Sequence, residues 1–196
     1  MRRKDSMMTV ALLFEGALVV VAIAAGWLLG APALADLRID VGSLGQGILA
    51  TLPILLLISP LARRNRSLDN LRDFVTRQIL PIFKDASLPQ LALLSALAGL
   101  GEEALFRGVL QTWLAQHLGT GAGWVLASVA FGLAHFINRT YAIIATLIGL
   151  YLGWLYLATG NLLVPAIAHG LYDFVALLVL LHEGRRKISP SRTRSE

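Results

Sequence analysis

The sequence contains no cysteine, which excludes disulfide bridges, cysteine-ligated zinc and a thiolate nucleophile. It is also poor in charge, because Asp, Glu, Lys and Arg make up 15% of the 196 residues, against about 25% in soluble domains. Hydrophobic residues account for 56% of the chain and the mean hydropathy is +0.69. This composition excludes an ordinary soluble domain and indicates an integral membrane protein. Any chemistry must then come from carboxylates, histidines or hydroxyl groups.

Charged residues are missing from long stretches of the chain, and each stretch is broken by turn-forming residues. A spanning helix needs about 20 mostly apolar residues, and the pairs Gly119/Gly121, Asn138/Arg139 and Gly160/Asn161 mark the breaks between neighbouring spans. The sequence therefore predicts an all-α fold, a polytopic membrane helical bundle of about six transmembrane helices. The predicted spans are residues 10–30, 43–62, 88–111, 122–138, 140–158 and 161–182.

Between the second and third spans, residues 65–90 carry apolar side chains at three- and four-residue spacing with basic and acidic residues among them. This pattern predicts a cytoplasmic amphipathic helix on the inner membrane surface, and a loop helix packed on the bundle is the alternative. The predicted organisation has three parts. They are an N-terminal pair of transmembrane helices with the amphipathic helix (1–87), a catalytic core (88–182) and a disordered basic cytoplasmic tail (183–196).

Basic residues are distributed unevenly along the predicted spans. With six spans and a cytoplasmic N-terminus, every Lys and Arg except Arg38 and Arg107 falls in an inner segment or tail, as the positive-inside rule requires. The net charge of +5 is thus explained by topology, and no nucleic-acid partner is expected. We expect a multi-pass protein of the bacterial cytoplasmic (inner) membrane with both termini in the cytoplasm.

Ionisable residues inside a span are costly, so each needs a reason. The third predicted span contains Glu102, Glu103 and Arg107. Glu103 and Arg107 are four residues apart and share a helix face, so the guanidinium can neutralise that carboxylate. Glu102 is turned roughly 100° away and has no local partner. One acid is therefore predicted to be structural and the other available for chemistry; a wholly structural cluster is the alternative.

Two further pairs lie on later spans at the same helical spacing. Phe131 and His135 are four apart on the fourth span, and His169 and Asp173 are four apart on the sixth. A single buried histidine is more often a satisfied core residue than a catalyst. Glu102, two histidines and an aspartate on three helices of a small bundle, however, predict a common hydrated pocket.

The residue types limit the reaction. With no cysteine and no Gly-x-Ser-x-Gly motif, peptide hydrolysis would use water as the nucleophile. A carboxylate can accept the proton of that water, and a histidine can share the base role or hold the water. The second histidine can donate to the developing oxyanion. No cofactor is required by this chemistry. A divalent metal such as zinc, held by Glu102, His135 and His169, is the alternative, although His-Glu-x-x-His is absent.

The three motifs Glu-Glu-x-x-x-Arg, Phe-x-x-x-His and His-x-x-x-Asp occur in this order on successive hydrophobic segments. Together they resemble the CAAX-protease and bacteriocin-processing family of intramembrane endopeptidases, also called the ABI family. The resemblance covers about residues 88–181, and the first two predicted spans carry no part of it. Asp173 stands where the prenyl-protein proteases typically carry Asn, which weakens the expectation of a prenylated CAAX substrate.

By that resemblance Glu102 and His135 would activate water, and His169 with the residue at 173 would form the oxyanion site. Glu103 and Arg107 would support them, as would Phe131 of the second motif. The family includes proteins described as metalloproteases and as metal-independent glutamate proteases, and both types stay open. The implied partners are the lipid bilayer and a membrane-embedded or lipid-anchored protein substrate. An ion-coupled transporter and a non-catalytic immunity or scaffold protein are the alternative functions.

Overall fold

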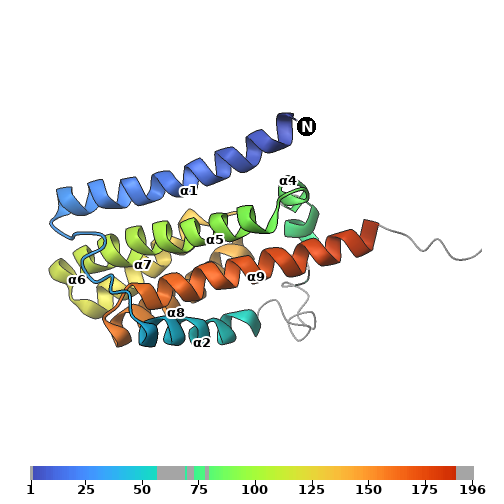
Figure 1. The fold of residues 1–196 in the computed structure, drawn as a ribbon. Helices are drawn as coiled ribbons and strands as arrows, with labels where there is room; N and C mark the ends of the chain where they lie inside the picture. Colours follow the sequence, from blue (N-terminus) through green and yellow to red (C-terminus); the bar gives the residue numbers. More distant parts are fainter. Residues whose placement is uncertain (1, 57–68, 70–72, 78–79, 189–196) are drawn as a thin grey trace, which may run out of the picture.

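The computed structural model describes residues 2–56, 69, 73–77 and 80–188, and these residues form helices joined by short turns, without a strand (Figure 1). The all-α membrane bundle predicted from composition is therefore confirmed. The helices are α1 (Arg2–Leu29), α2 (Val41–Leu55), α4 (Leu80–Phe83), α5 (Leu88–Glu103), the π-helix η3 (Ala104–Gln111), α6 (Thr112–Leu118), α7 (Thr120–Ala134), α8 (Arg139–Thr159) and α9 (Leu163–Ile188).

Helices α5 and α9 form the centre of the bundle. Helix α5 packs against both α1 and α9, whereas α9 also packs against α2 and α8. Helix α7 packs against α8 and η3, and Figure 1 shows α1 and α2 on opposite sides of the central pair. The polar motifs predicted from the sequence lie on α5, η3, α7 and α9, so the packing brings them together.

Local sequence signals fix where the central helices begin. Ser87 caps α5 in a capping box, in which its hydroxyl accepts from the Gln90 backbone and the Gln90 side chain accepts from the Ser87 N–H at 2.9 Å. Asn138 caps α8 by accepting from the Tyr141 N–H at 2.9 Å, and Gly160 ends that helix in the left-handed conformation. These caps satisfy backbone groups that would otherwise be unpaired at the helix ends.

Helices α5 and α9 approach each other at two glycines. A Cβ atom on Gly99 would lie 2.6 Å from the Ala166 carbonyl oxygen, and one on Gly170 would lie 2.8 Å from the Ser95 carbonyl oxygen. Small residues permit such close helix contact in membranes, where van der Waals packing drives association. This contact sets the α5–α9 distance one turn before Glu103 and directly beside His169.

The third predicted span is not a uniform α-helix. The α-helical hydrogen bonding of α5 ends at Glu103, and η3 continues as a π-helix to Gln111 before α6 resumes α-helical geometry to Leu118. The helical segment therefore runs past residue 111, the predicted end of the third span, to the break predicted at Gly119. The side chain of Thr112 donates to the Arg107 carbonyl at 3.0 Å, which helps to satisfy a backbone group that the wider turn displaces. π-Helical segments are often found at functional sites.

Three helical segments are long and apolar enough to cross a membrane, namely Met7–Leu29, Arg139–Thr159 and Leu163–Glu183. Val41–Leu55 and Thr120–Ala134 are shorter apolar helices. The count of six spans consequently stays a prediction. The end of the second predicted span and much of the predicted amphipathic helix at 65–90 lie outside the described residues; within that segment, residues 73–77 and 80–83 are helical.

The predicted start of a disordered tail at 183 was wrong, because α9 continues to Ile188. Arg185, Arg186 and Lys187 follow the last apolar turn, and cations at a helix C-terminus interact favourably with the helix dipole. Residues 189–196 lie outside the described part of the chain.

The loop between α1 and α2 is tied to the turn between α8 and α9. The Asn161 amide donates to the Arg38 carbonyl at 2.8 Å and to the Ser43 hydroxyl at 2.8 Å, while its oxygen accepts from the Arg38 N–H. Asp40 caps α2, and the hydrogen bonds from the Ser43 side chain and backbone lower the pKa of its carboxyl. This network holds the ends of α1, α2 and α9 together.

Candidate active site

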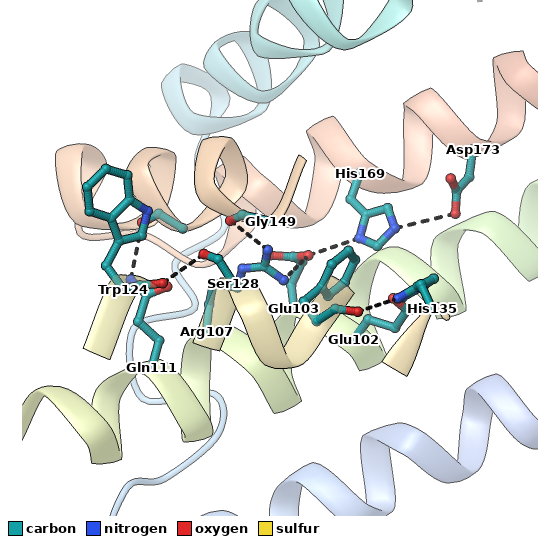
Figure 2. A network of polar contacts seen from close by, with 12 residues as sticks. Glu102, Glu103, Arg107, Gln111, Trp124, Ser128, His135, Gly149, His169 and Asp173 are labelled. Atoms are coloured by element: carbon teal, nitrogen blue, oxygen red, sulfur yellow. Dashed lines mark hydrogen bonds and ion pairs between the residues drawn. The ribbon is translucent and has the colours of Figure 1, made fainter. Parts of the chain in front are cut away.

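Glu103, Arg107 and His169 form the buried centre of the site (Figure 2). Arg107 donates to Oε1 of Glu103 at 2.9 Å, as the four-residue spacing predicted, and to the Gly149 carbonyl of α8 at 2.9 Å. The same Glu103 oxygen lies 2.9 Å from Nδ1 of His169. The side chains of Glu103 and Arg107 retain 0% and 1% of their exposure. Glu103 thus links η3 to α9 through Arg107 and His169.

His169 lies between two carboxylates. Its Nδ1 contacts Glu103, and its Nε2 lies 3.5 Å from Oδ2 of Asp173, one turn later on α9. A carboxylate only accepts hydrogen bonds, so the arrangement favours an N–H on each ring nitrogen. The positively charged imidazolium has both. The contact with Asp173 matches the pairing predicted from the sequence, whereas the shorter contact with Glu103 was not predicted.

Glu102 and His135 form a second pair of polar side chains in the site. Nε2 of His135 lies 3.4 Å from Oε2 of Glu102, and that oxygen has no hydrogen-bond partner among the residues the structure describes. Nδ1 of His135 lies 2.9 Å from the Phe131 carbonyl. Since a carbonyl only accepts, Nδ1 carries the proton and Nε2 of a neutral ring is an acceptor. When the ring is neutral, two acceptors face each other at a distance that a shared donor can bridge; when it is protonated, Nε2–H faces Glu102 directly.

His135 is held at the end of α7, not within a continuing helix. Helix α7 ends at Ala134 and His135 is its C-cap residue, so the predicted helical span to residue 138 was too long. Gly132 allows the close approach of α7 and α8, because a Cβ atom there would lie 2.7 Å from the Ala142 carbonyl. Helix termination at this position frees the His135 ring to turn toward Glu102 on α5.

Phe131 is the apolar platform of the site. The guanidinium of Arg107 lies 4.6 Å from the centre of its ring, within the range of a cation–π interaction. The rings of His135 and His169 lie 4.4 Å and 5.8 Å from it, centre to centre. Phe131 thus separates the two histidines and contacts both halves of the site.

Exposure increases along the site in one direction. The Glu103 and His169 side chains retain 0% and 6% of their exposure, whereas His135 retains 24% and Asp173 retains 33%. Figure 2 shows His135 and Asp173 together at one end of the network and Arg107 toward the other. A substrate would therefore reach Glu102 from the end marked by His135 and Asp173.

The alternative zinc ligands do not form a common set. In the described part of the chain, no three His, Asp or Glu side chains are grouped in a way that could hold a metal ion. Both nitrogens of His169 face carboxylates, Glu103 and Asp173, and not the pair Glu102 and His135. The donor set Glu102, His135 and His169 therefore does not fit a metal in this arrangement.

Two residues near the site were missed in the sequence analysis. Glu15 of α1 interacts electrostatically with Glu102, His135, His169 and Asp173, although the first span was treated as free of site residues. The sequence could have indicated Glu15, because it is the single ionisable residue between Met7 and Leu29. Tyr141 was also missed. Its ring lies 6.3 Å from that of His135, and no sequence pattern distinguished it from an interfacial aromatic residue.

Comparison with known proteins finds a family model and a curated relative that are similar to part of the chain. Residues 84–175 match the family model described as Type II CAAX prenyl endopeptidase Rce1-like, a range that contains every predicted site residue from Glu102 to Asp173. The protein YpbD of Bacillus subtilis (strain 168) is 41% identical over 97 residues, which are 48% of this chain and 47% of that protein. The chain thus spans about half the length of this curated relative. No solved structure gives a significant match.

Proposed function

We propose that this chain, which over residues 84–175 matches the Rce1-like family of CAAX endopeptidases, is an intramembrane endopeptidase that hydrolyses its substrate with an activated water. The observation that carries the proposal is the Glu102–His135 pair, whose Oε2 and Nε2 atoms lie 3.4 Å apart beside the buried imidazole of His169. Three helical segments of the described chain are long and apolar enough to span a bilayer. The substrate is accordingly a membrane-embedded or lipid-anchored protein.

The pair would orient the attacking water. A water that donates one hydrogen to Oε2 of Glu102 and the other to Nε2 of His135 keeps a lone pair free for the peptide carbonyl carbon. As the C–O bond forms, Glu102 takes the water proton as general base. The backbone contact of His135 is unchanged in this step, because Nδ1 stays bonded to the Phe131 carbonyl.

His169 would stabilise the negative charge that develops on the peptide oxygen. Its Nε2–H lies 3.5 Å from Asp173, a long contact from which the N–H can turn to the oxyanion. Donors aimed at the developing charge stabilise the transition state strongly in a water-poor site. Glu102 then returns its proton to the departing amine nitrogen, the C–N bond breaks, and a carboxylic acid and an amine leave the site.

Buried Glu103 and Arg107 are assigned a positioning role. Glu103 fixes the ring of His169 through Nδ1, and Arg107 fixes Glu103 while it contacts Phe131 and the Gly149 carbonyl. None of these groups faces the proposed water directly. They hold the oxyanion donor on α9 at a constant distance from the base on α5.

The proposal is tested with the full-length chain in lipid nanodiscs and single-span peptides with a fluorophore and a quencher. We expect cleavage to incorporate one oxygen-18 atom from labelled water into the new carboxyl group. Mass spectrometry of the products reads both the cleaved bond and the label. Proton or ion flux through the same chain in liposomes, without any cleavage, would favour an ion-coupled transporter and contradict the proposal.

Asp173→Asn tests the role of the acid on α9. If an ionised Asp173 holds the His169 imidazolium in place, the substitution lowers kcat by about tenfold to a hundredfold without abolishing it, because Asp173 acts through the histidine and a group that acts directly contributes about 10²- to 10⁴-fold. The alkaline side of the pH–rate profile changes as well, because the imidazolium loses the anionic neighbour that favours its protonated form. The profile of kcat against pH for both proteins is the measurement. A full rate with an unchanged profile would show that Asp173 does not act through His169.

We also propose that the protein lies in a bacterial cytoplasmic membrane with both termini in the cytoplasm. The distribution of Lys and Arg over the inner segments supports this orientation. Reporter tags near Arg64 and at the C-terminus are expected on the cytoplasmic side, and tags near Asp36 and Gly119 on the opposite side. A C-terminal tag outside the cytoplasm would remove one span from the predicted topology.

A further inference from the structure

Glu15 is a carboxylate that takes no part in the proposed reaction and lies outside the residues matched by the family. It is in the middle of the apolar segment Met7–Leu29, which is long enough to cross a membrane. A charged carboxylate near the bilayer centre costs at least about 2.5–3.5 kcal/mol on insertion scales, so an acid at such a position is expected to have a function.

Helix packing places Glu15 next to the catalytic pair. The Glu15 carbonyl oxygen lies 3.0 Å from the position that a Cβ atom on Gly101 would occupy, so α1 contacts α5 at the residue before Glu102. From there the Glu15 carboxylate interacts electrostatically with two acids and two imidazoles. These are Glu102, Asp173, His169 and His135.

The carboxylate of Glu15 lacks a complete set of partners. Its Oε2 atom is buried and has no hydrogen-bond partner in the described part of the chain. Oε2 of Glu103 is likewise buried without a partner, but its Oε1 is bonded to both Arg107 and His169. A carboxylate held in a low-dielectric region without a cation gains strongly when one is supplied.

The balance of acidic and basic groups in the whole site also favours a basic partner for Glu15. The acidic groups outnumber the basic ones even when both imidazoles are protonated. The acids are Glu15, Glu102, Glu103 and Asp173, and the basic groups are Arg107, His135 and His169. Glu103 and Arg107 pair with each other at the buried end, which leaves the three acids Glu15, Glu102 and Asp173 for two imidazoles.

We propose that Glu15 determines substrate specificity at this site by pairing with a basic residue of the substrate next to the scissile bond. The inference rests on the proposed peptidase activity. A Lys or Arg in that place supplies the missing cation.

The test uses the full-length chain in nanodiscs with single-span fluorogenic peptides whose scissile bond has first been located by mass spectrometry. At each position flanking that bond, Lys, norleucine or Glu is introduced into otherwise identical peptides. We expect one flanking position at which the wild-type protein cleaves the Lys peptide about tenfold more efficiently, in kcat/KM, than the norleucine peptide, the size of a partly desolvated charge pair.

Glu15→Gln is expected to bring the ratio of kcat/KM for the Lys and norleucine peptides to within about twofold of one, because the partner charge is removed. Glu15→Lys is expected to favour the Glu peptide, because the partner charge is reversed. Asp69→Asn, which removes an exposed carboxylate from the segment between α2 and α4, is the matched control and keeps the wild-type ratio.

Three results would overturn the inference. They are a wild-type ratio near one at every position, a ratio that survives Glu15→Gln, and an equal loss of rate on all peptides, which would assign Glu15 to the reaction itself. Absence of any Glu102-dependent cleavage would instead overturn the peptidase activity and this inference with it.

Discussion

Replacement of Glu102 by Gln is expected to abolish cleavage, with a loss of more than about a thousandfold in kcat, while folding and membrane insertion are retained. Gln has nearly the same shape as Glu but cannot accept the proton of the attacking water, and a positioned general base contributes about 10²- to 10⁴-fold. The initial rate of peptide cleavage in nanodiscs measures the loss of activity. The melting temperature of the purified protein shows whether folding is retained.

Glu183→Gln makes the same chemical change on α9 near its C-terminal end and is the control for a general effect of losing a carboxylate. We expect its cleavage rate to remain within about twofold of wild type, as is usual for substitutions away from the site. If Glu102→Gln keeps more than a tenth of the wild-type rate, Glu102 is not the base. His135 would then be the remaining group in contact with the proposed water.

Arg107→Ala is expected to cost about 3–5 kcal/mol of stability, because it leaves the buried carboxylate of Glu103 without its cation. The Gly149 carbonyl loses a donor in the same variant, and Phe131 loses a cation–π contact. The free energy of unfolding in mixed micelles with increasing denaturing detergent measures the effect. Activity falls too, since Glu103 then no longer fixes His169.

The chain offers a matched exposed pair for comparison. Arg77 and Asp73 have the same four-residue spacing and lie 3.5 Å apart, but the Arg77 side chain retains 76% of its exposure. Exposed ion pairs contribute roughly 0–1 kcal/mol, so Arg77→Ala is expected to change the free energy of unfolding by less than about 1 kcal/mol. A fully stable but inactive Arg107→Ala protein would contradict the positioning role and move Arg107 into the reaction.

The sequence was sufficient to predict the helical membrane fold because long apolar runs have few alternative structures in a bilayer. Helix ends at Gly119, Asn138 and Gly160 were predictable because their caps have a local cause. The pair Glu103 and Arg107 was likewise predictable, since both residues lie on one segment at a spacing that brings them together.

Features that depend on contacts between distant segments could not be predicted. The bond between Glu103 and His169 requires the close approach of α5 and α9 at Gly99 and Gly170, which are 71 positions apart in the sequence. Similarly, the π-helix η3 has no distinctive sequence; its Arg107 and Gln111 side chains donate to the Gly149 and Gly153 carbonyls of α8. Tertiary hydrogen bonds of this kind compensate for the poorer local geometry.

The contact between Glu15 and Gly101 has a consequence for transferring the core of this protein to other transmembrane helices. A chimera that grafts residues 84–175 onto unrelated transmembrane helices would carry all three motifs but would replace α1, the helix packed against the residue before Glu102. The foreign helix would need both a flat surface at Gly101 and a carboxylate at the corresponding depth. If Glu15 selects substrates as proposed, engineering this core for new targets begins with the α1 residues that contact α5.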